Sequence, residues 1–112
     1  PGWSEAYGLF LAGEADAVLS YATSPAYHLI AEGDAGFVAW PFREGHYLQV
    51  EVAAVLAGSD QPDLARAFMA FIPTEGFQAP IPTTNWMFPV IETDLPEGFM
   101  AMARPQTLLL PA

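Results

Sequence analysis

The stretch that decides the fold runs from Ala17 to Tyr27 and reads AVLSYATSPAY. Its first five residues form a short apolar run of the kind that makes a buried strand. Ser24 can then serve as a helix N-cap, and Pro25 fits the first helical position, so a helix is predicted to follow and to end at Gly33. A strand, a short loop and a helix in this order indicate an α/β structure.

Helices and strands are predicted to alternate on both sides of this stretch. The spacing of apolar residues predicts helices over residues 4–12 and 60–72. Strand patterns cover residues 36–42 and 46–57. The alternation predicts the α/β class, with a mostly parallel or mixed sheet flanked by helices.

The amino-acid composition argues against nucleic acid as a partner and against insertion into a membrane. The chain has 112 residues, 53% of them hydrophobic, and a formal net charge of -10 with three arginines and no lysine. This allows at most one domain and leaves no basic stripe for nucleic acid. The longest apolar runs, such as residues 52–57, fall far short of the roughly 20 residues that a membrane span needs, so the chain is not expected to be membrane-embedded.

Chemical motifs of enzymes are absent from the sequence. It contains no cysteine, no H-E-x-x-H, no glycine-rich phosphate loop and no G-x-S-x-G turn. His28 and His46 lie on different predicted elements without the spacing of metal ligands, which favours surface or hydrogen-bonded histidines. No catalytic residue, metal ligand or cofactor is therefore predicted.

Four aromatic residues lie at the ends of predicted elements or in loops, where core packing does not require them. They are Trp3, Tyr21, Tyr27 and Trp86. Aromatic faces attract organic cations, with contacts worth about 0.5 to 2 kcal/mol each, and they stack on flat heterocycles. The alternative is that these rings anchor loops on the core.

The segment from Tyr21 to Ser24 adds a polar feature. Thr23 and Ser24 place two hydroxyls beside a predicted helix N-terminus, at the carboxyl end of a predicted strand, where α/β folds bind ligands and anions are favoured. An ordinary helix cap is the alternative. Together with the aromatic residues, the segment predicts a ligand with a cationic aromatic part and a phosphate or hydroxyl tail.

Three strings resemble the periplasmic thiamine-binding proteins, the substrate-binding components of bacterial thiamine ABC importers. They are GWSEAYGLFLAGEADAVLSYATSPAYH (2–28), GHYLQVEVAAVLA (45–57) and IPTTNWMFPV (81–90). The resemblance extends over residues 2–110 and implies a fragment with the type II periplasmic-binding-protein fold. Residues 1–112 would then be the C-terminal part of a two-lobed solute-binding protein, incomplete on its own.

The resemblance also implies a function. The chain would bind thiamine or thiamine phosphate in the periplasm, deliver it to the permease subunits of an ABC transporter, and catalyse no reaction. The implied ligand-binding residues are Trp3, Tyr21, Ala22, Thr23, Ser24, Tyr27 and Trp86.

Two positions depart from the family pattern, since Ala22 and Thr84 stand where threonine and glycine are expected. The acidic ligand contact of the family's first lobe has no counterpart in this chain. Two other functions stay open: a binding protein for another solute, such as ferric iron or a polyamine, and a thiaminase-like enzyme. Trp3 and Trp86 favour a flat organic cation over iron.

An incomplete chain is expected to expose apolar faces that the rest of the protein would cover. Such faces and open sheet edges favour association. We therefore expect a homodimer or a strand-exchanged assembly, with Leu48, Val50, Val52 or Phe68 near the contact.

Overall fold

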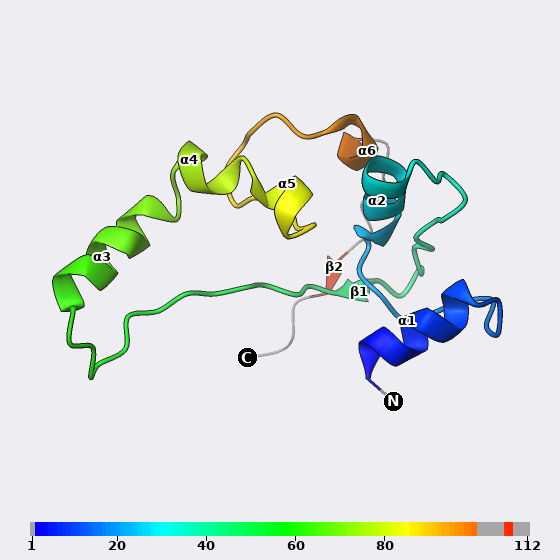
Figure 1. Ribbon diagram of the computed structural model, residues 1–112, viewed down its shortest axis with the longest axis horizontal. Coiled ribbons are helices and arrows are strands. Elements are labelled where there is room, and N and C mark those ends of the chain that lie inside the picture. The colour runs from blue at the N-terminus through cyan, green and yellow to red at the C-terminus, as the bar shows by residue number, and fades with distance from the viewer. Residues whose placement is uncertain (1, 101–106, 109–112) are drawn as a thin grey trace.

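The computed structural model describes residues 2–100 and 107–108 (Figure 1). In chain order the elements are α1 (Trp3–Leu11), α2 (Ser24–Tyr27), the π-helical turn η1 (His28–Glu32), β1 (His46–Tyr47), α3 (Pro62–Phe71), α4 (Glu75–Gln78), α5 (Ile81–Thr84), α6 (Glu97–Met100) and β2 (Thr107–Leu108).

The three helices predicted up to residue 72 are confirmed. α1 and α3 fall within two residues of the predicted bounds. The helix after Pro25 changes from α to π geometry at His28 before Gly33, in the left-handed conformation with φ 71°, ends it. Glycine suits that position because it adopts positive φ without steric cost.

The predicted strands are mostly wrong. Residues 17–21 and 36–42 form no strand, and of the predicted strand over 46–57 only His46–Tyr47 forms β1. β1 pairs in parallel with β2, with His46 opposite Thr107 and Tyr47 opposite Leu108. A strand needs a hydrogen-bonded neighbour, and the described part of the chain supplies one only for these two residues.

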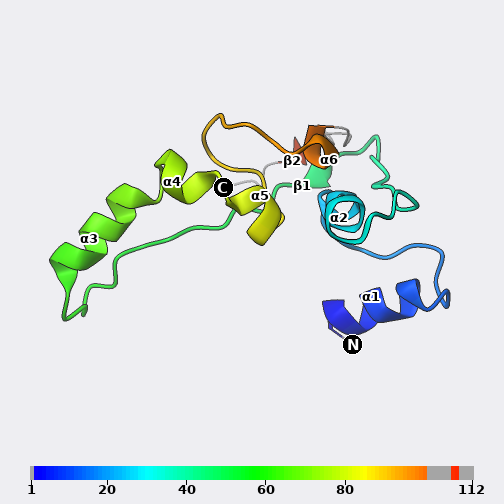
Figure 2. The same ribbon diagram turned by 45° about the horizontal axis from the view of Figure 1, so that its top comes forward.

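The chain is more extended than a compact domain of this length. Its radius of gyration is 17.0 Å, against about 13 Å for a compact domain of similar size. Figures 1 and 2 show α1, α2 and α6 toward one end and α3 and α4 toward the other, joined by a long extended segment between β1 and α3.

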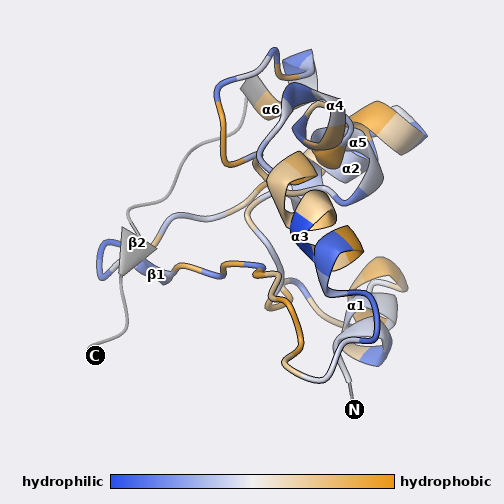
Figure 3. Cartoon of the chain, turned by 90° about the vertical axis from the view of Figure 1, so that its left-hand side faces the viewer, coloured by the Kyte–Doolittle hydropathy of each residue, from blue (hydrophilic) through white to orange (hydrophobic). Residues whose placement is uncertain are grey.

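This extended segment and α3 expose much apolar surface. Figure 3 shows that the segment after β1 is largely hydrophobic, and Val52 within it is 88% exposed. Leu48, Val50 and Phe68 are exposed as well. No residue of α3 is buried. Phe68 and Phe71 meet Phe77 of α4 edge to face, and both stay about half exposed.

A small core forms where α2 and η1 meet α6. Ala26 and Phe99 are buried there. Gly98 lies so close to Ile30 that an added Cβ would lie 2.8 Å from its Cγ1, so only glycine fits without a shift of that side chain. The ring of Phe88 meets that of Phe99 edge to face, with 5.5 Å between centroids.

The side chain of Gln78 joins two parts of the chain that follow α3. It is 2% exposed. Its Nε2 donates to the carbonyl of Ile72 at 2.8 Å, and its Oε1 accepts from the amide of Val90 at 2.9 Å. The buried amide thereby connects the end of α3 to the segment after α5.

We predict that Gln78→Ala lowers the free energy of unfolding by about 1 to 3 kcal/mol, because two backbone groups lose their partner. Urea unfolding measures this change. Gln49→Ala is the matched control, since Gln49 is exposed and surface changes alter stability by about 0.5 kcal/mol or less. Equal losses in both variants would contradict the bridging role.

Candidate functional site

The predicted polar segment forms the turn into α2. Thr23, not Ser24, is the N-cap residue, and neither side chain caps the helix. The Ser24 hydroxyl instead pairs with that of Ser20 at 2.8 Å. The prediction of Ser24 as the cap is wrong because Ser20 offers its hydroxyl a different partner.

The amides of this turn are mostly used within the chain. Those of Ser24 and Ala26 donate to the carbonyls of Tyr21 and Thr23 at 3.0 Å, and Pro25 has no amide hydrogen. The expectation of an open helix N-terminus for an anion is therefore wrong. Ala22 and Thr23 carry the nearby amides for which the described chain shows no partner.

Trp3 joins α1 to this turn. Its indole Nε1 donates to Ser20 Oγ at 3.2 Å, and its ring centroid lies 6.1 Å from that of Tyr21. Trp3 is 52% exposed and Tyr21 49% exposed. Trp3, Tyr21 and Ser24 are therefore gathered as one group, with two aromatic faces open to a ligand.

Tyr27 and Trp86 form a second group. Their rings meet edge to face, with 5.0 Å between centroids and 88° between planes. Trp86 has a φ of 55°, which is uncommon for a bulky residue and marks a backbone held by its surroundings. Thr84 lies in α5, a conformation that threonine adopts without strain, so glycine is not required there.

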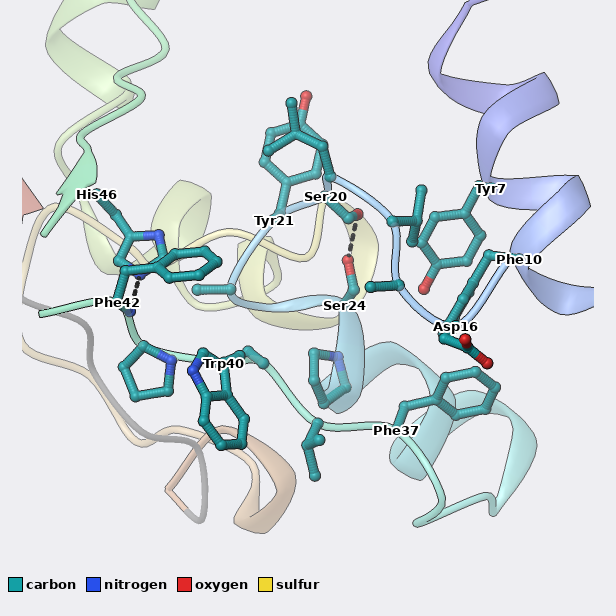
Figure 4. A pocket seen from close by; sticks show the side chains of 18 of the residues that line it. Tyr7, Phe10, Asp16, Ser20, Tyr21, Ser24, Phe37, Trp40, Phe42 and His46 are labelled. Atoms are coloured by element: carbon teal, nitrogen blue, oxygen red, sulfur yellow. Dashed lines mark hydrogen bonds between the residues drawn. The ribbon is translucent and has the colours of Figure 1, made fainter. Parts of the chain in front are cut away.

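A cavity of about 770 Å³ adjoins the first group (Figure 4). Tyr21, Ala22 and Ser24 line it, together with Tyr7 of α1 and Trp40 of the segment over 36–42. Trp3, Thr23, Tyr27 and Trp86 lie outside its lining. Two lining residues were not predicted as site residues: Tyr7, whose helical spacing indicated a core residue, and Trp40, within a predicted strand.

His28 is 1% exposed, and its ring lies 5.2 Å from that of Tyr27 between centroids. Its Nε2 pairs with the Tyr7 hydroxyl at 2.8 Å and its Nδ1 with Glu32 Oε2 at 2.6 Å. Its ring stacks on Phe37, with 3.7 Å between centroids. The prediction of a hydrogen-bonded histidine is confirmed, but nothing in the sequence pattern indicated this network.

Hydrogen bonding, charge and burial shift the pKa values of three residues around His28. The bond from His28 lowers the pKa of Glu32, which stays ionised at neutral pH. The carboxylate of Glu32 raises the pKa of Tyr27, because it favours the protonated hydroxyl. Burial raises the pKa of Tyr7. The tyrosine hydroxyls therefore keep their protons at neutral pH.

Neither a metal site nor a membrane-spanning helix is found in the described part of the chain. No group of three or more histidine, aspartate or glutamate side chains there could hold a metal ion. No helix in that part of the chain is long and apolar enough to span a membrane.

Comparison with solved structures defines the class of protein. A periplasmic thiamin binding protein matches 99% of this chain with a TM-score of 0.88 and 56% identity, and the match covers 35% of that protein's chain. The fold is therefore that of part of a type II periplasmic solute-binding protein, as the sequence predicts. The chain belongs to the bacterial extracellular solute-binding protein family, whose model matches residues 1–79.

Sequence relatives agree with this assignment. The thiamine-binding periplasmic protein of Salmonella typhimurium is 58% identical over 96% of this chain and 33% of its own length. Its Escherichia coli namesake is 57% identical over the same shares, and that of Brucella melitensis is 52% identical over 99% and 34%. The chain spans about a third of the length of these curated relatives.

Proposed function

We propose that this chain is the C-terminal part of a two-lobed solute-binding protein that binds thiamine or a thiamine phosphate in the periplasm and delivers it to the permease subunits of an ABC importer. The observation that carries the proposal is the pair of aromatic contacts, Trp3 with Tyr21 and Tyr27 with Trp86, whose tyrosines come before and after a hydroxyl-bearing turn in the chain. The names and identities of the relatives support it.

Thiamine joins a flat, permanently cationic thiazolium ring to an aminopyrimidine ring. Half-exposed tryptophan and tyrosine faces suit both rings through cation–π contact and stacking. The net charge of -10 also attracts a cation over long range. The two aromatic groups therefore match the charge and the shape of the vitamin.

The turn before α2 suits the phosphate or hydroxyl end of the ligand. The amides of Ala22 and Thr23, which have no partner among the described residues, and the hydroxyl of Ser24 belong to consecutive residues of this turn. Amide and hydroxyl donors form charge-assisted hydrogen bonds with phosphate. These amides and this hydroxyl would thus bind the phosphate, a role that the sequence predicted for the N-terminus of the helix.

The remaining ligand contacts, including an acidic one, would come from the other lobe. The relatives are named for thiamine binding, so a ferric-iron or polyamine carrier is not favoured, and neither is a thiaminase-like enzyme. We propose a binding protein without catalytic activity or cofactor.

The proposal predicts that the full-length protein binds thiamine and releases it unchanged. Titration calorimetry with thiamine and its phosphates measures the binding, and mass spectrometry of the released ligand tests for cleavage. Absence of heat with all three, together with binding of a polyamine or ferric iron, would reject the proposal. Turnover of thiamine would identify an enzyme instead.

The two parts of the site should respond differently to mutation. Trp86→Ala should weaken thiamine, its monophosphate and its diphosphate by similar factors, on the order of tenfold, because it removes aromatic contact common to all three. Ser24→Ala should weaken the phosphates more than thiamine, because it removes a donor for the anion. Calorimetry measures both, and equal losses for the three ligands in Ser24→Ala would contradict the assigned role.

The 112-residue chain alone should form a homodimer or a strand-exchanged assembly and bind thiamine weakly or not at all. Its exposed apolar segment, with Leu48, Val50 and Val52, and the apolar stripe of α3, with Phe68, are the surfaces proposed to associate. Light scattering at tens of micromolar measures the mass. A monomer that binds thiamine tightly would show a self-sufficient domain.

A further inference from the structure

Glu51 connects the extended segment after β1 to the loop that carries Trp86. Its Oε2 accepts a hydrogen bond from Nδ2 of Asn85 at 3.0 Å, across 34 positions of sequence. Asn85 is the C-cap residue of α5 and directly precedes Trp86. A side chain on the extended segment therefore holds the residue next to one of the proposed ligand-binding residues.

The backbone at Trp86 has a conformation that depends on its surroundings. Its φ of 55° lies in the left-handed region, which a bulky residue keeps only where the neighbouring structure imposes it. The amide of Asn85 donates to the carbonyl of Ile81 at 2.9 Å and so ties the start of the loop to α5. With the bond to Glu51, Asn85 is held through both its backbone and its side chain.

The other end of the same loop is held as well. The amide of Val90 donates to Oε1 of the buried Gln78 at 2.9 Å. Between these two anchors the ring of Trp86 meets that of Tyr27 edge to face, with 5.0 Å between centroids. The loop over residues 85–90 thus has a side-chain anchor at each end, and the anchor through Glu51 is the one next to Trp86.

The exposure of this hydrogen bond favours a role in positioning over a role in stability. Glu51 and Asn85 are both exposed, so water can replace a lost partner and the bond adds little to the free energy of unfolding. The bond still restricts the loop, and a loop that is ordered before binding loses less conformational freedom when the ligand arrives. Its removal should therefore change affinity more than stability.

We propose that Glu51 is a positioning residue for ligand binding: by holding the side chain of Asn85, it keeps Trp86 against Tyr27 in the orientation that receives the ligand. The inference rests on the proposed function, because it concerns the ligand-binding role of Trp86. Glu51 acts here as a hydrogen-bond acceptor and not through its charge. An uncharged acceptor at this position should therefore serve as well.

Breaking the bond from either side in the full-length protein tests the inference, with thiamine as the probe and calorimetry as the measurement. Glu51→Ala should weaken binding by a factor on the order of five, because a smaller fraction of the protein then has Trp86 in the binding orientation. Asn85→Asp should do the same, because two carboxylates then face each other without a donor. An added negative charge by itself favours a cation, so a loss of affinity reports the broken bond.

Exchanging the two polar groups restores the bond in the opposite direction. In the double variant Glu51→Gln with Asn85→Asp, an amide at position 51 can donate to a carboxylate at position 85, and the net charge of the chain is unchanged. Its affinity for thiamine should return to within about twofold of the wild-type value, and so should that of Glu51→Gln alone. Direct attraction between Glu51 and the ligand would not produce this rescue.

Two controls separate positioning from other causes. In the Trp86→Ala background, Glu51→Ala should weaken binding by about twofold or less, because the ring that it positions is gone. Glu44→Ala removes an exposed carboxylate that forms no hydrogen bond within the described part of the chain, and it controls for the change in net charge. Urea unfolding without ligand shows whether each variant folds, and Asn85→Asp replaces Glu51→Ala in the Trp86→Ala background if the alanine variant unfolds.

The outcomes distinguish the two proposals. A wild-type protein that does not bind thiamine overturns the proposed function, and this inference with it. A wild-type protein that binds thiamine overturns only the positioning role of Glu51 if Glu51→Ala has no effect, if its effect is the same in the Trp86→Ala background, or if the exchanged pair binds no better than Asn85→Asp.

Discussion

The arrangement around α2 depends on the buried imidazole of His28. A polar ring placed among Tyr7, Phe37 and the backbone of η1 is stable only if both nitrogens have partners, because a buried polar group without one is costly. Tyr7 and Glu32 meet that requirement from different elements. The need to satisfy one side chain thus joins α1 to η1 and holds the Glu32 carboxylate against the imidazole.

In contrast to the imidazole of His28, the backbone of two segments beside the cavity lacks hydrogen bonds between the segments. The two segments that flank the cavity, over residues 16–22 and 36–42, are not paired with each other through the backbone. Extended backbone requires a neighbouring strand. Among the described residues, the helices satisfy backbone hydrogen bonds within themselves, whereas these two extended segments do not pair with each other.

The contrast between local hydrogen bonds in helices and long-range pairing in strands explains which elements could be predicted from the sequence. Helices were predicted well because their apolar spacing and end signals lie within a dozen residues, as for α1 and α3. The predicted strands failed because pairing is decided by distant residues, as between His46 and Thr107. Trp3 and Tyr21 were both predicted as aromatic ligand contacts, and their rings lie 6.1 Å apart although Tyr21 ends no strand. The pairing of His28 with Tyr7 could not follow, because it joins side chains 21 residues apart that no local pattern connects.

The open faces of the site bear on how such a protein works under the proposed function. Trp3 and Tyr21 leave about half of their surface exposed, so they can cover one side of a flat ring while its other side stays in water. In the proposed two-lobed protein the other lobe would cover that second side, and the ligand would then be part of the contact between lobes. A ligand that makes more contacts in a closed state shifts the population toward it. A permease can then distinguish loaded from empty carrier by the arrangement of its lobes.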